Sequence, residues 1–227
     1  ISALQLQFNQ NLLYETNNTY VVVDKLSDLD GLPQSDIERA SAMAAAQGQP
    51  DKWMFNMQRA SCNPVRQYCT NRDLRRRVYE AYCNRGYQGN QYDSREICAK
   101  LVRLRLERAN LMGFNNAAEQ ILDTRMAKTP EAVYNLLDQI WTPAVAKANE
   151  ELDDIRKEMQ KDGLTCEPEG WDYRFYSERA RKAKFNFDEN QLSEYLEINN
   201  VLKGVFYTAT KLYGITFKEI TSEVPAY

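Results

Sequence analysis

Acidic side chains crowd one helical segment in the second half of the sequence. Glu150, Glu151, Asp153 and Asp154 are close neighbours, and closely spaced carboxylates can bind a cation or exchange protons with a substrate. On an α-helix, however, adjacent residues point in different directions around the axis. The four carboxylates also alternate with an apolar stripe. We therefore interpret them as a solvated helix face.

Arginines form a second group that could do chemistry, because guanidinium groups bind phosphate. They are concentrated in two predicted helical segments, at Arg72, Arg75, Arg76, Arg77, Arg103, Arg105 and Arg108. The alternative is a solvated face whose arginines pair with Asp73, Glu80 and Glu107 at helical spacing. The formal net charge is −3, and no aromatic residues are interleaved on the same face. We therefore favour surface ion pairs and predict no nucleic-acid partner.

Histidine is absent from all 227 residues. Its absence excludes an HExxH zinc site, a Ser-His-Asp triad and a Cys-His dyad. The GxGxxG, P-loop and G-x-S-x-G signatures are also missing. We predict no catalytic residue and no metal ligand in this chain, and we expect no cofactor to bind within it.

The five cysteines are Cys62, Cys69, Cys83, Cys98 and Cys166. Their odd number and the lack of a C-x-x-C pair argue against a disulfide framework and against a zinc knuckle. Cysteine otherwise behaves as a small hydrophobic residue. We expect free thiols that are buried or partly buried.

Tyrosine is abundant, with 14 residues in the chain. Five of them gather near the C-terminal end, at Tyr173, Tyr176, Tyr195, Tyr207 and Tyr213. They suit a core in which each hydroxyl reaches a polar partner at the boundary. They would also suit the wall of a peptide channel, so both interpretations stay open and the substrate-binding residues are unknown.

The elements that position these groups are mostly helical. Residues 1–60 combine helices with two short β-branched or alternating segments, 19–23 and 52–57, that could pair as a small sheet. Residues 61–227 are helical almost throughout. The predicted fold class is therefore mainly α, multi-helical, with a possible two-stranded β element near the N-terminus. No apolar run approaches the roughly 18 residues that cross a bilayer, so no membrane partner is predicted.

Several helix ends are marked by capping residues. Residues 1–16 place Leu4, Phe8, Leu12 and Leu13 on one face of a helix that ends at Asn17. Capping boxes are expected at Ser35 with Glu38 and at Asp93 with Glu96. A helix is also predicted from Asn71 to Asn84, and the one after Asp93 is expected to be central because it is apolar over much of its circumference.

Thr129 before Pro130 predicts the start of a helix that reaches Asp162. One apolar stripe is expected along it, formed by Val133, Leu137, Ile140, Ala144, Ala148, Leu152, Ile155 and Met159.

The segment from Gly170 to Ile220 reads as a helical hairpin followed by an extended tail. Asp188 and Gln191 form a capping box for its second helix, and Phe187 can close over that end. Apolar residues then recur at helical spacing, at Leu192, Tyr195, Leu196, Leu202, Phe206, Ala209 and Tyr213. Gly214 follows as the predicted left-handed residue that ends the helix.

This hairpin carries a family resemblance. Trp171-Asp172-Tyr173, Phe175-Tyr176, FDENQLSEYLEINNVLKGVF and KLYGITFKE closely resemble a segment of the M3 family of zinc metallopeptidases. FNQNLLYETNNTYVVV, DLDGLP, NRDLRRRVYEAYCNRG and RLRLERANLMGFNNAAEQILDTRMAKTPEAV follow the order found in that family. The resemblance spans nearly the whole chain and is closest to the peptidyl-dipeptidase Dcp and oligopeptidase A types, which the family shares with thimet oligopeptidase.

The resemblance implies a zinc-dependent enzyme that hydrolyses short peptides in a deep channel. Its HExxH region, which binds zinc and activates water, has no counterpart in residues 1–227. We therefore expect an internal fragment that supplies a helical wall of the channel, partners with the missing catalytic half and is inactive alone. We expect a cytoplasmic location, with the periplasm as the alternative. The alternative function is a non-catalytic helical interaction module related to M3 peptidases.

Overall fold

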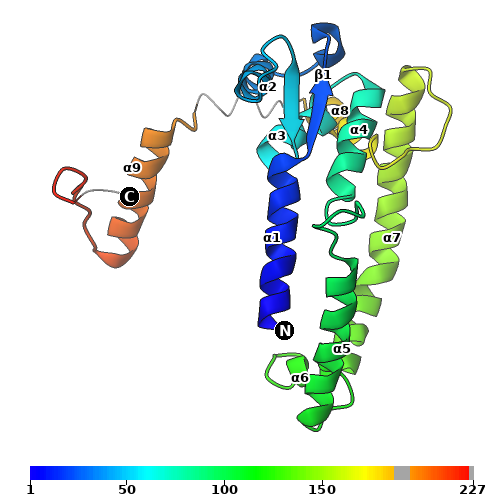
Figure 1. The fold of residues 1–227 in the computed structure, drawn as a ribbon, viewed down its shortest axis with the longest axis vertical. Helices are drawn as coiled ribbons and strands as arrows, with labels where there is room; N and C mark the ends of the chain where they lie inside the picture. Colours follow the sequence, from blue (N-terminus) through cyan, green and yellow to red (C-terminus); the bar gives the residue numbers. More distant parts are fainter. Residues whose placement is uncertain (187–194, 225–227) are drawn as a thin grey trace. The chain divides into compact units, whose positions relative to one another are not determined.

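The computed structural model of the chain describes residues 1–186 and 195–224. The chain divides into two compact units, residues 1–180 and 181–227, and each is described by itself. Within the described residues the fold is mainly helical, with one small antiparallel sheet near the N-terminus (Figure 1). The predicted fold class is confirmed.

The first unit begins with helix α1 (Ser2–Asn18) and strand β1 (Tyr20–Val23). A 3-10 turn, η1 (Leu26–Leu29), leads to helix α2 (Gln34–Ala46) and strand β2 (Trp53–Asn56). The two strands pair antiparallel, as their β-branched and alternating sequences predict. The alanine-rich α2 packs on β2, because its small side chains allow close approach.

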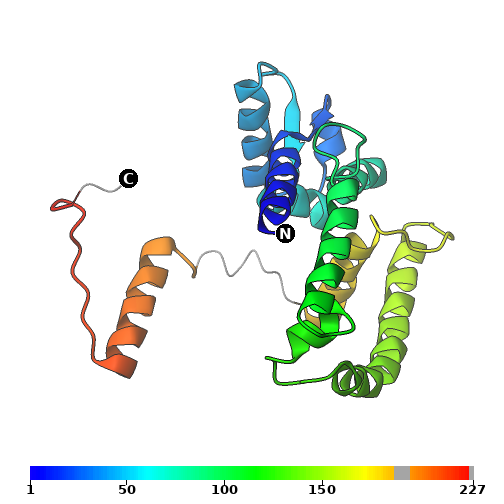
Figure 2. The same ribbon diagram turned by 60° about the horizontal axis from the view of Figure 1, so that its bottom comes forward.

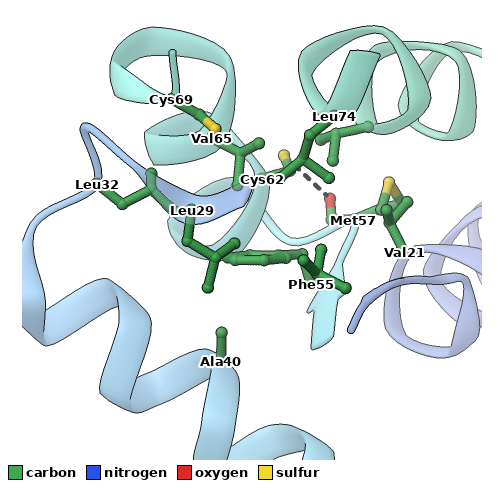
Figure 3. Close-up of a cluster of buried hydrophobic side chains, with 12 residues drawn as sticks. Val21, Leu29, Leu32, Ala40, Phe55, Met57, Cys62, Val65, Cys69 and Leu74 are labelled. Atoms are coloured by element: carbon green, nitrogen blue, oxygen red, sulfur yellow. Dashed lines mark hydrogen bonds between the residues drawn. The ribbon is translucent and has the colours of Figure 1, made fainter. Parts of the chain in front are cut away.

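The main core lies between this sheet and the next two helices. Val21 of β1 is paired with Phe55 of β2, and both side chains are buried. Figure 3 shows the ring of Phe55 beside Leu29 and Ala40. The cluster is completed by Val23 of β1, by Leu32 just before α2 and Met57 just after β2, and by residues of the next two helices and the turn between them: Cys62, Val65, Cys69, Leu74 and Val78. This region buries its apolar surface within the unit itself.

The helices after β2 are α3 (Arg59–Tyr68), α4 (Arg72–Cys83), α5 (Arg95–Leu111), α6 (Ala117–Leu122) and α7 (Pro130–Lys161). Figure 2 shows the chain leaving the end of α5, passing through α6 and returning along α7.

The first unit ends within α8 (Tyr173–Phe185). The last turns of α7 and the first turns of α8 form a second small core, in which Ile155 and Met159 contact Phe175 and Tyr176.

The predicted cap at Thr129 is confirmed, and the helix predicted from Asn71 has Asn71 as its N-cap. The Asn71 side chain accepts a hydrogen bond from the Leu74 N–H at 3.1 Å, and Thr129 accepts one from the Ala132 N–H at 3.3 Å. Each bond satisfies a backbone donor that has no partner inside its helix.

The two capping boxes predicted in the first unit, at Ser35 and at Asp93, are wrong. Pro33 occupies the N-cap position of α2, so Ser35 already lies inside the helix. Ser94 occupies that position in α5, although Asp93 still accepts a hydrogen bond from the Arg95 N–H at 3.0 Å. In both cases the helix boundary is shifted by one or two residues, the scale on which sequence patterns locate helix ends poorly.

Helix α1 extends through Asn18, beyond the predicted end. Leu13 is exposed, whereas Asn11 and Glu15 are buried. The reason is that this part of α1 packs against a polar loop, residues 84–94, in addition to the contacts that α1 makes with α5 and β2. Glu15 accepts hydrogen bonds from the backbone of that loop and from the Asn90 side chain, the latter at 2.8 Å.

The prediction that α5 is central is also wrong. Val102 is 67 % exposed, and only three apolar side chains of the helix are buried. The apolar stripe of α7 behaves in the same way, because Ile155 and Met159 are buried while Leu137 and Ile140 are exposed. The sequence pattern is correct, but the described chain covers only the C-terminal end of that stripe.

The second unit contains helix α9 (Ile198–Tyr213), which ends at Gly214 with φ 68°, as predicted. Glu197 is its N-cap, so Tyr195 and Leu196 precede the helix and the prediction that they belong to it is wrong. The expected cap and staple residues Phe187, Asp188, Gln191 and Leu192 lie outside the described residues. No helix in the described part of the chain is both long and apolar enough to cross a membrane.

Candidate functional site

A buried carboxylate joins two parts of the first unit that are about a hundred residues apart in sequence. Asp172, just before α8, has no exposed side-chain surface. Arg72 of α4 donates from Nε and Nη2 to its two oxygens at 2.9 and 2.7 Å, and Arg75 Nη2 donates at 3.2 Å. The Glu169 N–H donates a further bond at 3.1 Å. We call Arg72, Arg75 and Asp172 the ion-pair node.

Local structure explains the geometry of the node. Arg72 and Arg75 are three residues apart at the start of α4, so their side chains lie on one face of the helix. Asp172 lies at the start of α8, where its own carbonyl accepts the Tyr176 N–H at 3.0 Å. Two helix starts are thus joined through one carboxylate, with a bidentate arginine contact that fixes orientation as well as distance.

Arg75 is the more buried of the two arginines, with 1 % of its side chain exposed. It donates hydrogen bonds to the carbonyls of Cys69 and Thr70 at 2.9 and 3.1 Å. Its guanidinium carbon lies 4.0 Å from the centre of the Phe175 ring. Carbonyls, a carboxylate and an aromatic face together replace the water that this charge has lost.

Burial raises the pKa of Asp172, but the hydrogen bonds from Arg72 and from the Glu169 N–H outweigh it, and the pKa lies below its usual range. The same contact, in which Arg72 donates to the Asp172 carboxylate, holds the pKa of Arg72 above its usual value. The node is therefore a fixed ion pair at neutral pH, which suits a structural role better than proton transfer.

The prediction that these arginines belong to a solvated face is wrong for Arg72 and Arg75 and correct for Arg76, which pairs with Asp73 at 2.7 Å. Arg77 donates to the backbone carbonyl of Val22 at 2.8 Å. The signal that was available is the Trp171-Asp172-Tyr173 motif, where an acidic residue lies between aromatic ones. Spacing alone could not pair it with arginines about a hundred positions away.

A second polar contact lies next to the node. The Tyr176 hydroxyl donates to Asp162 Oδ2 at 3.0 Å, and Arg179 forms an ion pair with the same carboxylate. Burial, and then the bond to Asp162, raise the pKa of Tyr176 to about 12. Tyr176 thus follows the first of the two predicted patterns, a core ring whose hydroxyl reaches a polar partner.

The other tyrosines of the predicted cluster are exposed. Tyr173 lies in the first unit, whereas Tyr195, Tyr207 and Tyr213 lie in the second. The described residues therefore identify Tyr176 as a core residue and leave the other four at the surface of their own units.

The acidic segment in α7 forms ion pairs with lysine or arginine one helical turn away. Lys147 contacts Glu150 at 2.7 Å, and Arg156 contacts Asp153 at 2.8 Å. These pairs confirm the interpretation as a solvated helix face. Across residues 1–186 and 195–224, no cluster of cysteine, aspartate and glutamate is arranged to hold a metal ion.

All five cysteines are free. Cys62 and Cys69 are buried, as expected, and burial raises the pKa of both thiols. Cys83, Cys98 and Cys166 are exposed, so the expectation of burial is wrong for them. These three lie on helices or loops whose outer faces the described chain leaves open.

An uncovered apolar surface runs along the first half of α7. Its exposed members recur at helical spacing, at Tyr134, Leu137, Ile140, Trp141 and Val145. Trp141 alone is 70 % exposed. We call these five residues the α7 apolar face. Contiguous apolar surface of this kind marks a contact site in soluble proteins.

Helix α9 of the second unit is apolar on several sides. Leu202, Phe206 and Tyr213 are exposed. The ring of Phe206 stacks on Phe217 with centres 4.5 Å apart, so the tail after Gly214 folds back along the helix. Even so, no residue of α9 is buried.

Comparison with known proteins identifies the family. The model of Peptidase family M3 matches residues 65–227, more than half of the chain. The chain belongs to peptidase family M3. The match begins in α3 and includes the node, the α7 apolar face and α9.

Relatives of this M3 chain align over nearly all of its length. Dipeptidyl carboxypeptidase of Escherichia coli (strain K12) is 34% identical over 229 residues, which cover 100% of this chain and 33% of the relative. Oligopeptidase A of the same organism is 30% identical over 223 residues, covering 96% of this chain and 33% of the relative. Organellar oligopeptidase A of Arabidopsis thaliana is 29% identical over 236 residues, covering 100% and 30%. The M3 chain thus spans about a third of the length of these curated relatives.

Proposed function

We propose that the protein containing this M3 chain is a zinc-dependent oligopeptidase or peptidyl-dipeptidase that hydrolyses short peptides. The observation that carries the proposal is the family match over residues 65–227, in line with relatives named dipeptidyl carboxypeptidase and oligopeptidase A. Those names describe the relatives, and we extend peptide hydrolysis from them to the protein of which this chain is a part. A cytoplasmic or periplasmic location would suit such an enzyme.

Zinc is assigned to the parent protein and not to this chain. The chain has no histidine, and its described acidic and thiol groups do not gather into a metal site. Zinc in peptidases requires three protein ligands and an open position for water. The residues present do not fit such a site, so we assign no catalytic residue and no metal ligand here.

The role proposed for the chain is structural, because it would hold helices in place beside the catalytic part. The node fixes α4 to the start of α8, and the main core anchors α4 to the sheet. The α7 apolar face and the apolar residues of α9 would then meet the catalytic part of the parent, forming a helical wall of the substrate channel. Their exposure in the described chain supports this role, because surfaces of that kind are normally covered.

A two-polypeptide experiment tests the proposal. The 227-residue chain and the remainder of its parent are expressed separately, and cleavage of an internally quenched peptide is measured with and without a zinc chelator. We expect neither part alone to cleave, and the mixture to cleave in a zinc-dependent manner. Zinc-dependent cleavage by the 227-residue chain alone would refute its inactive role. A parent without an HExxH sequence would favour the non-catalytic interaction module instead.

Two variants of α7 test whether the α7 apolar face contacts the catalytic part, as the proposed channel wall requires. Trp141→Asp places a charge in the α7 apolar face and should reduce the activity of the mixture at least tenfold. Gln139→Asp, on an exposed position of the same helix, serves as the matched control and should leave it unchanged. Equal activity of both variants would show that this face makes no contact with the catalytic part.

A further inference from the structure

Two arginines without a carboxylate partner contact the ring of Tyr82. Arg66 belongs to α3, Tyr82 to the last turn of α4, and Arg85 follows that helix. The guanidinium carbon of Arg66 lies 5.0 Å from the centre of the ring, and that of Arg85 lies 3.8 Å from it. Both cations therefore border the same ring. We propose that they bind a phosphate group at its edge, and we call Arg66, Tyr82 and Arg85 the Tyr82 anion site.

Arg66 forms no hydrogen bond or ion pair with any residue that the structure describes. Its guanidinium carbon lies 5.3 Å from the centre of the Tyr79 ring as well, so its contacts are aromatic. Nε is buried without an acceptor, whereas the two terminal nitrogens are not closed off from solvent. A partly dehydrated cation without an acceptor lacks the hydrogen bonds that water would give it. The open N–H groups of Arg66 therefore suit an anionic ligand.

Arg85 is held in place by neutral groups. Its Nε donates to the Tyr82 carbonyl and its Nη1 donates to Thr16 Oγ1, each at 2.8 Å. Neither acceptor carries a charge, so the guanidinium is oriented but not neutralised. Its Nη2 has no hydrogen-bond partner among the described residues and is open to solvent. A cation that is oriented in advance loses less conformational freedom when a ligand binds, which favours binding.

A third arginine adds to the positive charge of this region. Burial raises the pKa of the Cys62 thiol, and the charges of Arg66, Arg85 and Arg174 oppose that rise, so all three lie near one position. None of the three forms an ion pair with a described residue. Glu15 of α1 has its carboxylate bonded to the loop after α4. Like charges that gather without acidic partners repel one another, and a bound anion would relieve that repulsion.

A phosphate group matches this arrangement in charge and in geometry. It carries about two negative charges for the two guanidinium groups, and its three oxygens can accept from both at once. The Tyr82 hydroxyl has no partner among the described residues and can donate a further hydrogen bond. Free phosphate and the phosphate of a nucleotide share this chemistry. The site lies wholly in the first unit and needs neither zinc nor the catalytic part, so it goes beyond the proposed function.

Titration of the unmodified chain tests the site directly. Sodium phosphate is added to the isotopically labelled 227-residue chain at constant ionic strength, and the Nε–H signals of Arg66 and Arg85 are followed by NMR. We expect saturable shifts of both signals at millimolar phosphate, similar shifts with sulfate and none with chloride. Tighter binding of adenosine monophosphate than of phosphate would assign the site to nucleotides, and equal or weaker binding would assign it to free phosphate. Shifts that do not saturate, or equal shifts with chloride, overturn the proposal.

Two variants with the same change of charge provide the complementary test. Arg66→Gln removes one cation from the Tyr82 anion site, and Arg76→Gln removes one from an exposed position of α4 that pairs with Asp73. The first should weaken phosphate binding about tenfold, because a charged hydrogen-bond donor is lost, and the second should leave it unchanged. Equal weakening by both variants overturns the proposal. If Arg66→Gln does not fold, the shifts of the unmodified chain decide alone.

Discussion

Apolar side chains around the sheet are buried, whereas many of those on α5 and α7 are exposed. Around the sheet, Phe55, Leu74 and Val78 are buried. On α7, Leu137, Ile140 and Trp141 are exposed although they are as apolar and as regularly spaced. The first region completes its core within the first unit, and the second presents a face that stays exposed among the described residues. Amphipathic spacing therefore shows that a surface is to be covered, but not by which polypeptide.

The sharpest test of this comparison removes a large side chain from each region. Phe55→Ala should lower the free energy of unfolding by about 3–5 kcal/mol, because a fully packed ring is replaced by a cavity. Leu137→Ala should change it by less than about 0.5 kcal/mol, because that side chain is exposed. Urea unfolding followed by circular dichroism measures both. A large loss for Leu137→Ala would mean that the α7 apolar face is covered in solution.

The next test concerns the node, which joins the start of α4 to the start of α8. Asp172→Ala leaves two arginines without their carboxylate and should cost about 3 kcal/mol in the same unfolding assay. Glu150→Ala removes an exposed carboxylate from a single ion pair and should cost less than about 1 kcal/mol. If the two variants lose equal stability, the node is no more than a surface salt bridge.

The contribution of Tyr176 to the free energy of unfolding should depend on pH. Its folded pKa is raised to about 12, above the value of about 10 for an unfolded tyrosine. The neutral Tyr176 hydroxyl therefore stabilises the fold fully below about pH 10. This stabilisation is lost as the pH rises toward 12. Tyr176→Phe should therefore lose on the order of 1 kcal/mol at pH 8 and progressively less at higher pH, measured by unfolding at each pH. A difference between the two proteins that stays constant with pH would contradict this assignment.

The smallest effect is expected at the N-terminus of α7. Thr129→Ala removes the hydrogen bond to the Ala132 N–H and should reduce the stability of that end by about 0.5–1 kcal/mol. Because the first half of α7 has few buried contacts, the loss should appear as faster amide exchange in residues 130–140 and not in the sheet. Uniformly faster exchange across the first unit would show that the two regions unfold together.

Local signals predicted much of the fold. The cap at Thr129, the left-handed residue Gly214 and the two strands depend on residues that are close in sequence, and all are confirmed. The polar face of α1 was not predicted, because Glu15 has its partners in a loop some seventy residues away. Apolar spacing alone gives no sign of such a contact.

The node was missed for the same physical reason. Arg75 and Asp172 are 97 residues apart, and a row of arginines at the start of a helix is usually solvated. The expectation of no catalytic or metal residue depends on the absence of histidine and stays a prediction for the chain.

Residues 76–171 form one long segment whose two ends are joined by the node, and we call this segment the excursion. For a long flexible segment, doubling its length adds only about 0.6 kcal/mol to the entropy of closure. Lengthening the turns near Gly113 and Lys128 should therefore leave the sheet and the node intact. The excursion could thus change in length between related proteins and reach different neighbours while its base stays the same. The ion pair between α4 and α8 would make the tip of the excursion a site where insertions are tolerated.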